Sequence, residues 1–157
     1  MIDAIVELRK KYPVHLLLVG DGPYKDTLAT CVLNANASRY VHFLGRRSDV
    51  NTILANSDIF VLSSNHEGLP NSLMEAMAMG LPCVATDVGG VRQLITDETK
   101  GIVVSPKSST DIVAAVAYYI ENCKEMETIG RNAYDVMRKN YEQQAVAEEL
   151  LTIYKKY

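Results

Sequence analysis

The sequence predicts an α/β fold, a Rossmann-like doubly wound parallel sheet with helices on both faces. Short continuous apolar runs alternate with segments of helical periodicity, the links between them are short, and the apolar runs end in glycine-containing loops. A continuous apolar run is typical of a strand covered on both faces, as in a parallel sheet. Because parallel crossovers are right-handed and need helical cover, the alternation favours the doubly wound arrangement.

The elements follow in order from these patterns. Strands are expected at 15–20, 41–45, 58–64, 82–90 with its turn, and 101–105. Helices are expected at 2–12, 24–37, 49–54 and 70–80 and, beyond the last strand, at 108–122, 125–140 and 142–156. Pro13 stops the first helix, and Gly80 ends the one that starts at Pro70. We expect one domain over 1–140 and a separate C-terminal helix over 141–157.

Composition excludes several classes of protein. Of the 157 residues, 48% are hydrophobic and 22% are charged, which is enough apolar sequence for a globular core. The net charge of −3 provides no basic field for nucleic acid. The three cysteines have no metal-ligand spacing and fit reduced thiols in a cytoplasmic protein. The first residues do not resemble a signal peptide, and no apolar run reaches the roughly 20 residues of a membrane span.

The stretch EGLPNSLMEAMAMG after the third strand has the chemistry of a sugar-nucleotide site. Pro70 suits a first helical turn, Asn71 or Ser72 can cap it, and first-turn amides favour a phosphate. Glu67 on the loop and Glu75 in the first turn offer carboxylates for the paired hydroxyls of sugars. In open parallel sheets, ligands bind at the carboxyl ends of strands, where this loop lies.

Other interpretations of these acids stay open. Ser72 and Glu75 also match the S-x-x-E capping box, in which Glu75 only ties off the helix start. Glu67 is equally well explained as a solvated loop acid.

The remaining loop motifs are weaker. VGDGP, which contains Gly20, lacks the third glycine of a dinucleotide fingerprint, so a tight turn is favoured over a role in lining a site. The pair Gly89 and Gly90 fits either a tight turn or a close approach of the backbone to a ligand. Arg46 and Arg47 could bind a phosphate, or they could simply be solvated surface residues. No metal-ligand set and no Ser-His-Asp set is visible.

The whole chain resembles the C-terminal, donor-binding domain of retaining GT-B glycosyltransferases, family 4 (group 1). The runs LLLVGDGP, VHFLGRRSDV, SDIFVLSSNHEGLPNSLMEAMAMGLPCVATDVGGVRQLI and GIVVSP follow the order and spacing of that family. Its E-x7-E motif falls on Glu67 and Glu75.

The resemblance implies roles for individual residues. Glu67 is implied as the catalytic-centre residue that contacts hydroxyls of the transferred sugar, and Glu75 as the residue that binds the ribose. Backbone near Gly68, Leu69, Asn71 and Ser72 is implied to hold the sugar or diphosphate, and the strand ends at Gly20, Gly45 and Arg46 to line the nucleotide side. The family uses no metal at this centre and no cofactor besides its nucleoside diphosphate sugar, and the EGLPN loop favours a UDP sugar.

The sequence also departs from the family pattern. Gln93 stands where the family has a glutamate. The acceptor-binding domain has no counterpart here, and neither has the first strand of the sheet, which lies at its centre in the order 3-2-1-4-5-6. We therefore expect the strands at 15–20 and 58–62 to close on each other, or another chain segment to fill the slot between them.

The resemblance implies a domain that binds the donor for sugar transfer with retention to an acceptor hydroxyl, in polysaccharide or glycolipid synthesis. We expect this piece alone to be inactive, and we expect no nucleic-acid partner. Expected partners are the nucleotide sugar, an acceptor domain or another chain, a membrane surface for the intact enzyme, and a second copy through the sheet edge or C-terminal helix. Alternatives are a non-catalytic binding or assembly module and, less favoured, a receiver domain, for which HLLLVGDGP supplies only Asp21.

Overall fold

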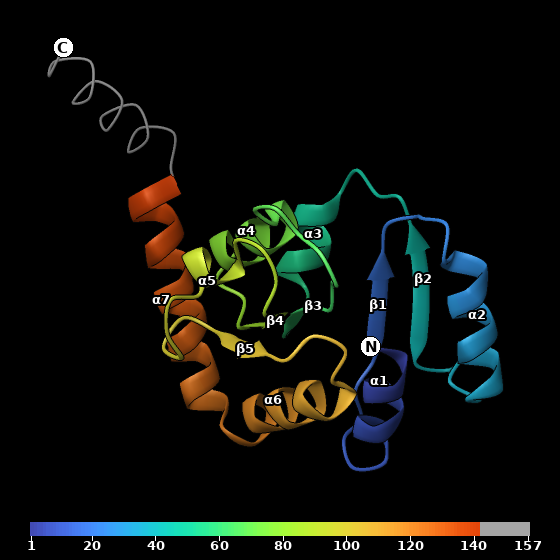
Figure 1. Cartoon of the computed structure of the whole chain (residues 1–157). Coiled ribbons are helices and arrows are strands. Elements are labelled where there is room, and N and C mark those ends of the chain that lie inside the picture. The colour runs from blue at the N-terminus through green and yellow to red at the C-terminus, as the bar shows by residue number, and fades with distance from the viewer. Residues whose placement is uncertain (142–157) are drawn as a thin grey trace, which may run out of the picture.

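The computed structural model describes residues 1–141 and contains five strands and seven helices (Figure 1). The strands are β1 (Leu16–Val19), β2 (Val41–Gly45), β3 (Phe60–Leu62), β4 (Cys83–Thr86) and β5 (Ile102–Val104). The helices are α1 (Ile2–Arg9), α2 (Lys25–Asn34), α3 (Val50–Ala55), α4 (Asn71–Ala78), α5 (Val91–Leu94), α6 (Ser109–Glu121) and α7 (Cys123–Tyr141). All five strands and all helices expected before residue 141 are therefore present, and α5 was not predicted.

The strands form two parallel sheets rather than one. β1 pairs with β2, with Leu16 opposite Val41, whereas β3, β4 and β5 pair in that order, with Phe60 opposite Cys83. The two groups of strands are separate in Figure 1. The expectation that the strands at 15–20 and 58–62 close on each other is wrong, because β1 and β3 share no ladder in the described chain.

Strand β4 lies at the centre of the core. All four of its residues are buried. Cys83 and Ala85 belong to a cluster built around α4, which we call the α4 cluster, whereas Val84 belongs to a cluster with α6, the α6 cluster. Helices therefore cover both faces of this sheet, as predicted for a doubly wound fold.

Helix α1 packs on both halves of the molecule. Ile2 and Ile5 belong to a third cluster, the α2 cluster, together with Val32 and Val41, and Leu16 and Leu18 pack against it. Ala4 and Leu8 instead join the α6 cluster. The helix thus connects two sheets that have no backbone hydrogen bonds to each other.

Helix α4 ends in the manner that Gly80 predicts. Gly80 has φ +74°, its N–H donates to the carbonyl of Met77, and the N–H of Leu81 donates to that of Ala76. These two bonds satisfy carbonyls at the end of the helix, and the left-handed conformation favours glycine. Helix α7 passes so close that a Cβ on Gly130 would lie 2.2 Å from the carbonyl oxygen of Gly80.

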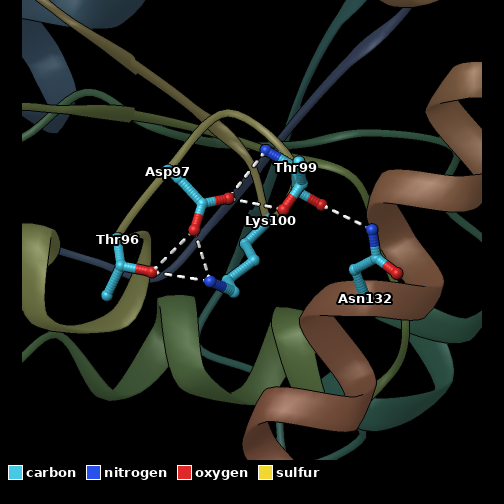
Figure 2. A network of polar contacts seen from close by, with 5 residues as sticks. All are labelled: Thr96, Asp97, Thr99, Lys100 and Asn132. Atoms are coloured by element: carbon cyan, nitrogen blue, oxygen red, sulfur yellow. Dashed lines mark hydrogen bonds and ion pairs between the residues drawn. The ribbon is translucent and has the colours of Figure 1, made fainter.

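The loop between α5 and β5 is held by a polar network (Figure 2). The carboxylate of Asp97 accepts from the hydroxyls of Thr96 and Thr99 and pairs with the ammonium of Lys100. The side-chain amide of Asn132 on α7 donates to the carbonyl of Thr99 at 2.9 Å. These bonds hold the pKa of Asp97 below its ordinary value, chiefly through Lys100.

The expected helix at 142–156, and with it the separate segment 141–157 and its proposed role in pairing, lies outside the described residues. Within residues 1–141, no helix is both long and apolar enough to span a bilayer.

Candidate functional site

The loops at the carboxyl ends of the strands carry the predicted site residues in two groups. One group follows β1 and β2, and the other follows β3 and runs into α4. Each strand fixes the start of its loop, because a parallel ladder determines where the backbone leaves the sheet.

The first group surrounds an open pocket of about 600 Å³ at the ends of β1 and β2. Gly20, Asp21, Gly22 and Arg46 line it. The N–H of Gly20 donates to the carbonyl of Gly45 at 2.8 Å, which joins the two strand ends. The structure therefore brings the predicted residues Gly20, Gly45 and Arg46 together.

Of the two neighbouring arginines, Arg47 is already paired. Its guanidinium donates twice to the carboxylate of Asp49, at 2.8 and 2.7 Å. These bonds lower the pKa of Asp49. Arg46, by contrast, lines the pocket with no acidic partner among the described residues, so it is the arginine that can meet an anionic ligand.

The second group begins with Glu67, which is half-buried in the loop after β3. Its Oε1 accepts a hydrogen bond from the hydroxyl of Ser64 at 2.6 Å. The carboxylate is therefore fixed by a neighbour, and the interpretation of Glu67 as a merely solvated loop acid does not account for this contact.

The backbone that carries Glu67 rests against the loop after β4. The N–H of Gly90 donates to the carbonyl of Gly68 at 2.6 Å. A Cβ on Gly89, which has φ +51°, would lie only 1.9 Å from the carbonyl oxygen of Glu67. Gly89 and Gly90 therefore form a turn and also allow a close contact. The contact is with the backbone of the Glu67 loop rather than with a ligand.

Helix α4 starts without a side-chain cap. Pro70 occupies the N-cap position, and neither Asn71 nor Ser72 caps the helix, contrary to our expectation. In the described part of the chain, the N–H groups of Asn71 and Ser72 have no hydrogen-bond acceptor. Two first-turn donors, with the positive end of the helix dipole behind them, are therefore available to an anion.

Glu75 lies just beyond the first turn of α4, in which it was predicted. It is the fifth residue of the helix, exposed, and outside the first turn. Because Ser72 is inside the helix and forms no cap bond, the capping-box interpretation is wrong. The carboxylate of Glu75 has no hydrogen-bond partner among the described residues, so it is available to a ligand.

The remaining members of the second group are Gly68 and Leu69, which are exposed between Glu67 and Pro70. No described residue of this group lines the pocket at β1 and β2. The structure thus assembles each group separately, one from two strand ends and one from a loop and a helix start.

The sequence analysis did not single out two hydroxyl residues that support Glu67, Ser64 and Thr86. Thr86 at the end of β4 is 1% exposed, and its hydroxyl donates to the carbonyl of Ser64 at 2.6 Å. The signal was present, since Thr86 is the one polar residue of the apolar run that forms β4 and Ser64 ends the strand predicted at 58–64. Beside them, Arg92 pairs with Asp87 at 2.8 Å and lowers the pKa of that carboxyl.

No cluster of three metal-ligating side chains occurs within residues 1–141. The second group instead offers carboxylates and backbone donors, which suit hydroxyls and phosphates.

Solved structures with the same fold include glycosyltransferases. Anabaena HepE, crystallised with UDP-glucose, is 28% identical and superposes with a TM-score of 0.86 over 96% of this chain and 44% of its own. The C-terminal domain of a glycosyl transferase group 1 family protein from Francisella tularensis is 30% identical, with a TM-score of 0.81 over 90% of this chain and 77% of its own. These matches confirm the predicted fold of a GT-B C-terminal domain.

Curated relatives are also sugar transferases. The chain is 32% identical to N,N'-diacetylbacillosaminyl-diphospho-undecaprenol alpha-1,3-N-acetylgalactosaminyltransferase of Campylobacter jejuni, over 92% of this chain and 38% of the relative. It is 29% identical to N-acetyl-alpha-D-glucosaminyl L-malate synthase of Bacillus anthracis, over 98% of this chain and 40% of the relative. The chain thus spans about two fifths of the length of these relatives. The family described as glycosyl transferases group 1 matches residues 1–136, and the chain belongs to this family.

Proposed function

We propose that this chain is the donor-binding domain of a glycosyltransferase that moves a sugar from a nucleoside diphosphate to an acceptor hydroxyl. The observation that carries the proposal is the arrangement at α4. A positioned Glu67 carboxylate directly precedes a helix start whose first amides, at Asn71 and Ser72, have no acceptor in the described chain. Carboxylates bind sugar hydroxyls, and a helix N-terminus binds a diphosphate.

Each group then has its own part of the donor. Glu67 contacts the sugar hydroxyls and Glu75 the ribose hydroxyls. Backbone of Gly68, Leu69, Asn71 and Ser72 holds the sugar and diphosphate, and Gly20, Gly45 and Arg46 line the nucleotide side. The UDP-glucose complex of HepE supports a uridine nucleotide as the donor.

Stabilisation of the departing diphosphate by the α4 amides is the main catalytic contribution of this domain. The same proposal includes three further points: transfer with retention, membership of the glycosyltransferase family numbered 4, and a place in polysaccharide or glycolipid assembly. We also propose a cytoplasmic location, supported by the free thiols of Cys31, Cys83 and Cys123. Because the chain spans about two fifths of the length of its relatives, we also propose that the purified chain alone turns over no donor. Release of UDP from UDP-glucose at a measurable rate would contradict this.

Calorimetric titration tests the donor-binding assignment. UDP, GDP, UDP-glucose and UDP-N-acetylglucosamine are titrated into the parent, Glu75→Ala and Glu67→Ala, with Glu98→Ala as a control for loss of an exposed acid elsewhere. Loss of a hydrogen bond to a charged group costs about 1.5–3 kcal/mol, or roughly tenfold to a hundredfold in affinity. Glu75→Ala should lower the affinity for every nucleotide, whereas Glu67→Ala should remove only the difference in affinity among the UDP sugars. Equal binding by all four proteins would overturn the assignment.

A partner strand for β1 and β3 completes the proposal. The N–H of Leu16 donates to the carbonyl of Tyr40, just before β2, and the N–H of Gly20 donates to that of Gly45 at the end of β2. The N–H of Leu17, between them, therefore points away from β2. Because α1 packs on both sheets, we propose that a strand from the rest of a longer protein, or from another chain, pairs between β1 and β3.

Sedimentation of the parent and Leu17→Lys, a charge at the strand edge, distinguishes the sources of this strand. Association of the parent with rising concentration, abolished by the lysine, identifies a second copy. Full protection of the Leu17 amide from hydrogen exchange in a monomer would overturn the proposal.

A further inference from the structure

We propose that Ser64, held in place by the buried Thr86, is a positioning residue that orients the Glu67 carboxylate so that its free oxygen faces the donor sugar. The inference rests on the proposed function, because it assigns the device that orients the sugar-binding acid of that site.

The device begins at Thr86 in the core. Thr86 is a buried polar side chain at the end of the otherwise apolar strand β4. Its Oγ1 lies 2.6 Å from the carbonyl oxygen of Ser64 and 3.4 Å from that of Leu62. A threonine hydroxyl has one proton, which goes to the nearer acceptor. A rigid group on β4 therefore fixes the backbone of Ser64, two residues beyond the end of β3.

The second step runs from Ser64 to the acid. The Ser64 hydroxyl donates its single proton to Oε1 of Glu67 at 2.6 Å. A hydrogen bond from a hydroxyl to a carboxylate is short and stronger than a neutral one. With Oε1 engaged, Oε2 has no partner in the described structure and remains as the acceptor for a ligand hydroxyl.

The loop backbone is immobilised independently of this bond. The Gly90–Gly68 hydrogen bond and the close packing of Gly89 on the Glu67 carbonyl hold the main chain. Removal of the Ser64 hydroxyl should therefore free the Glu67 side chain while the loop stays in place. The consequence falls on sugar recognition rather than on folding or nucleotide binding.

The test compares four variants with the parent: Ser64→Ala, Ser64→Thr, Thr86→Val and Thr86→Ser. Thermal melts first show that each variant folds. Each protein is then titrated calorimetrically with UDP and with one UDP sugar, the one that the parent prefers among UDP-glucose, UDP-galactose and UDP-N-acetylglucosamine. The quantity compared is the ratio of the affinity for the UDP sugar to the affinity for UDP. Ser64→Ala should change the ratio of the two affinities by about tenfold and leave UDP affinity within about twofold. Ser64→Thr, which keeps a hydroxyl, should restore the parental ratio. Thr86→Val should reduce the ratio less than Ser64→Ala does, and Thr86→Ser should preserve it.

Glu67→Ala in the same series separates the inference from the proposed function. If Glu67→Ala changes the ratio and Ser64→Ala does not, the positioning role is wrong while the donor site stands. If Ser64→Ala lowers only the melting temperature, Ser64 is structural and the inference fails. If the UDP sugar and UDP bind with equal affinity to the parent and also to Glu67→Ala, the proposed function fails, and the inference fails with it.

Discussion

The β1–β2 sheet and the β3–β4–β5 sheet carry two parts of one candidate site but are built differently. Every residue of β4 is buried between helices on both faces. In β1, half-buried residues that face the α2 cluster alternate with Leu17 and Val19, which are each 42% exposed. Within residues 1–141, the sheet that leads to Glu67 thus has its central strand covered on both faces, although β3 keeps a free edge, whereas the sheet that lines the proposed nucleotide pocket has one apolar face and one strand edge of β1 uncovered.

Substitution of leucines in the two halves should show the largest difference. Leu73 on α4 is fully buried in the α4 cluster, so Leu73→Ala should lower the free energy of unfolding by about 4 kcal/mol. Leu17→Ala should cost about 1 kcal/mol or less, because the side chain is already partly in water. Urea denaturation measures both. Similar losses would mean that Leu17 is covered in solution.

Two glycines in left-handed conformation provide a matched pair. Gly89 and Gly45 have φ +51° and +63°, but only at Gly89 would a Cβ collide with backbone. Gly45→Ala should cost about 1–2 kcal/mol from conformation alone. Gly89→Ala should cost about 3 kcal/mol, since overpacking is added, and should displace the Glu67 loop. Thermal unfolding and UDP-glucose titration of both variants check this, and a functional Gly89→Ala would contradict the close approach.

Amide hydrogen exchange should separate the sheets without any substitution. The amides of Val84 and Ala85 lie in a central, buried strand, whereas the Leu17 amide has no acceptor in the described structure. Exchange at Leu17 should be at least about a hundredfold faster, because local opening there breaks no ladder bond. Equal protection, measured by NMR, would show that the edge of β1 opposite β2 is paired.

The smallest effect should come from the network at Asp97, which ties the second sheet to α7. The lowered pKa of Asp97 means that its contribution to stability is present above the ordinary carboxyl pKa of about 4 and is lost as pH falls below it. Asp97→Asn should lower the melting temperature slightly at pH 7, with the difference from the parent shrinking toward pH 2.

Glu98→Gln, on the same loop, serves as the control. A difference between parent and Asp97→Asn that stays constant with pH would show that the ionised carboxylate contributes nothing.

The sequence was sufficient for the five strands, for every described helix except α5 and for the fold class, because these depend on local periodicity and on the covered faces of parallel strands. It also placed Gly80 correctly, since only glycine readily adopts the left-handed conformation at the end of α4. It failed where outcomes depend on tertiary contacts. Nothing in the order of residues reveals that Pro70 takes the N-cap position that Asn71 or Ser72 was expected to fill.

The support of Glu67 was equally hidden. Ser64 is three residues from Glu67 and visible as a neighbour, but Thr86 reaches it from another strand, 22 positions away. The pairing of β1 and β3 was mispredicted because a ladder needs two edges at the right separation, and α1, α2 and α6 hold these edges by side-chain packing.

Helix α1 has a consequence for how the two parts of the proposed donor site are aligned. Since one side of this helix contacts the α2 cluster and another side the α6 cluster, a rotation or shift of α1 moves the ends of β1 and β2 relative to the loop of Glu67. The spacing between the proposed nucleotide pocket and the proposed sugar-binding acid therefore depends on the packing of an eight-residue helix that contributes no residue to either group.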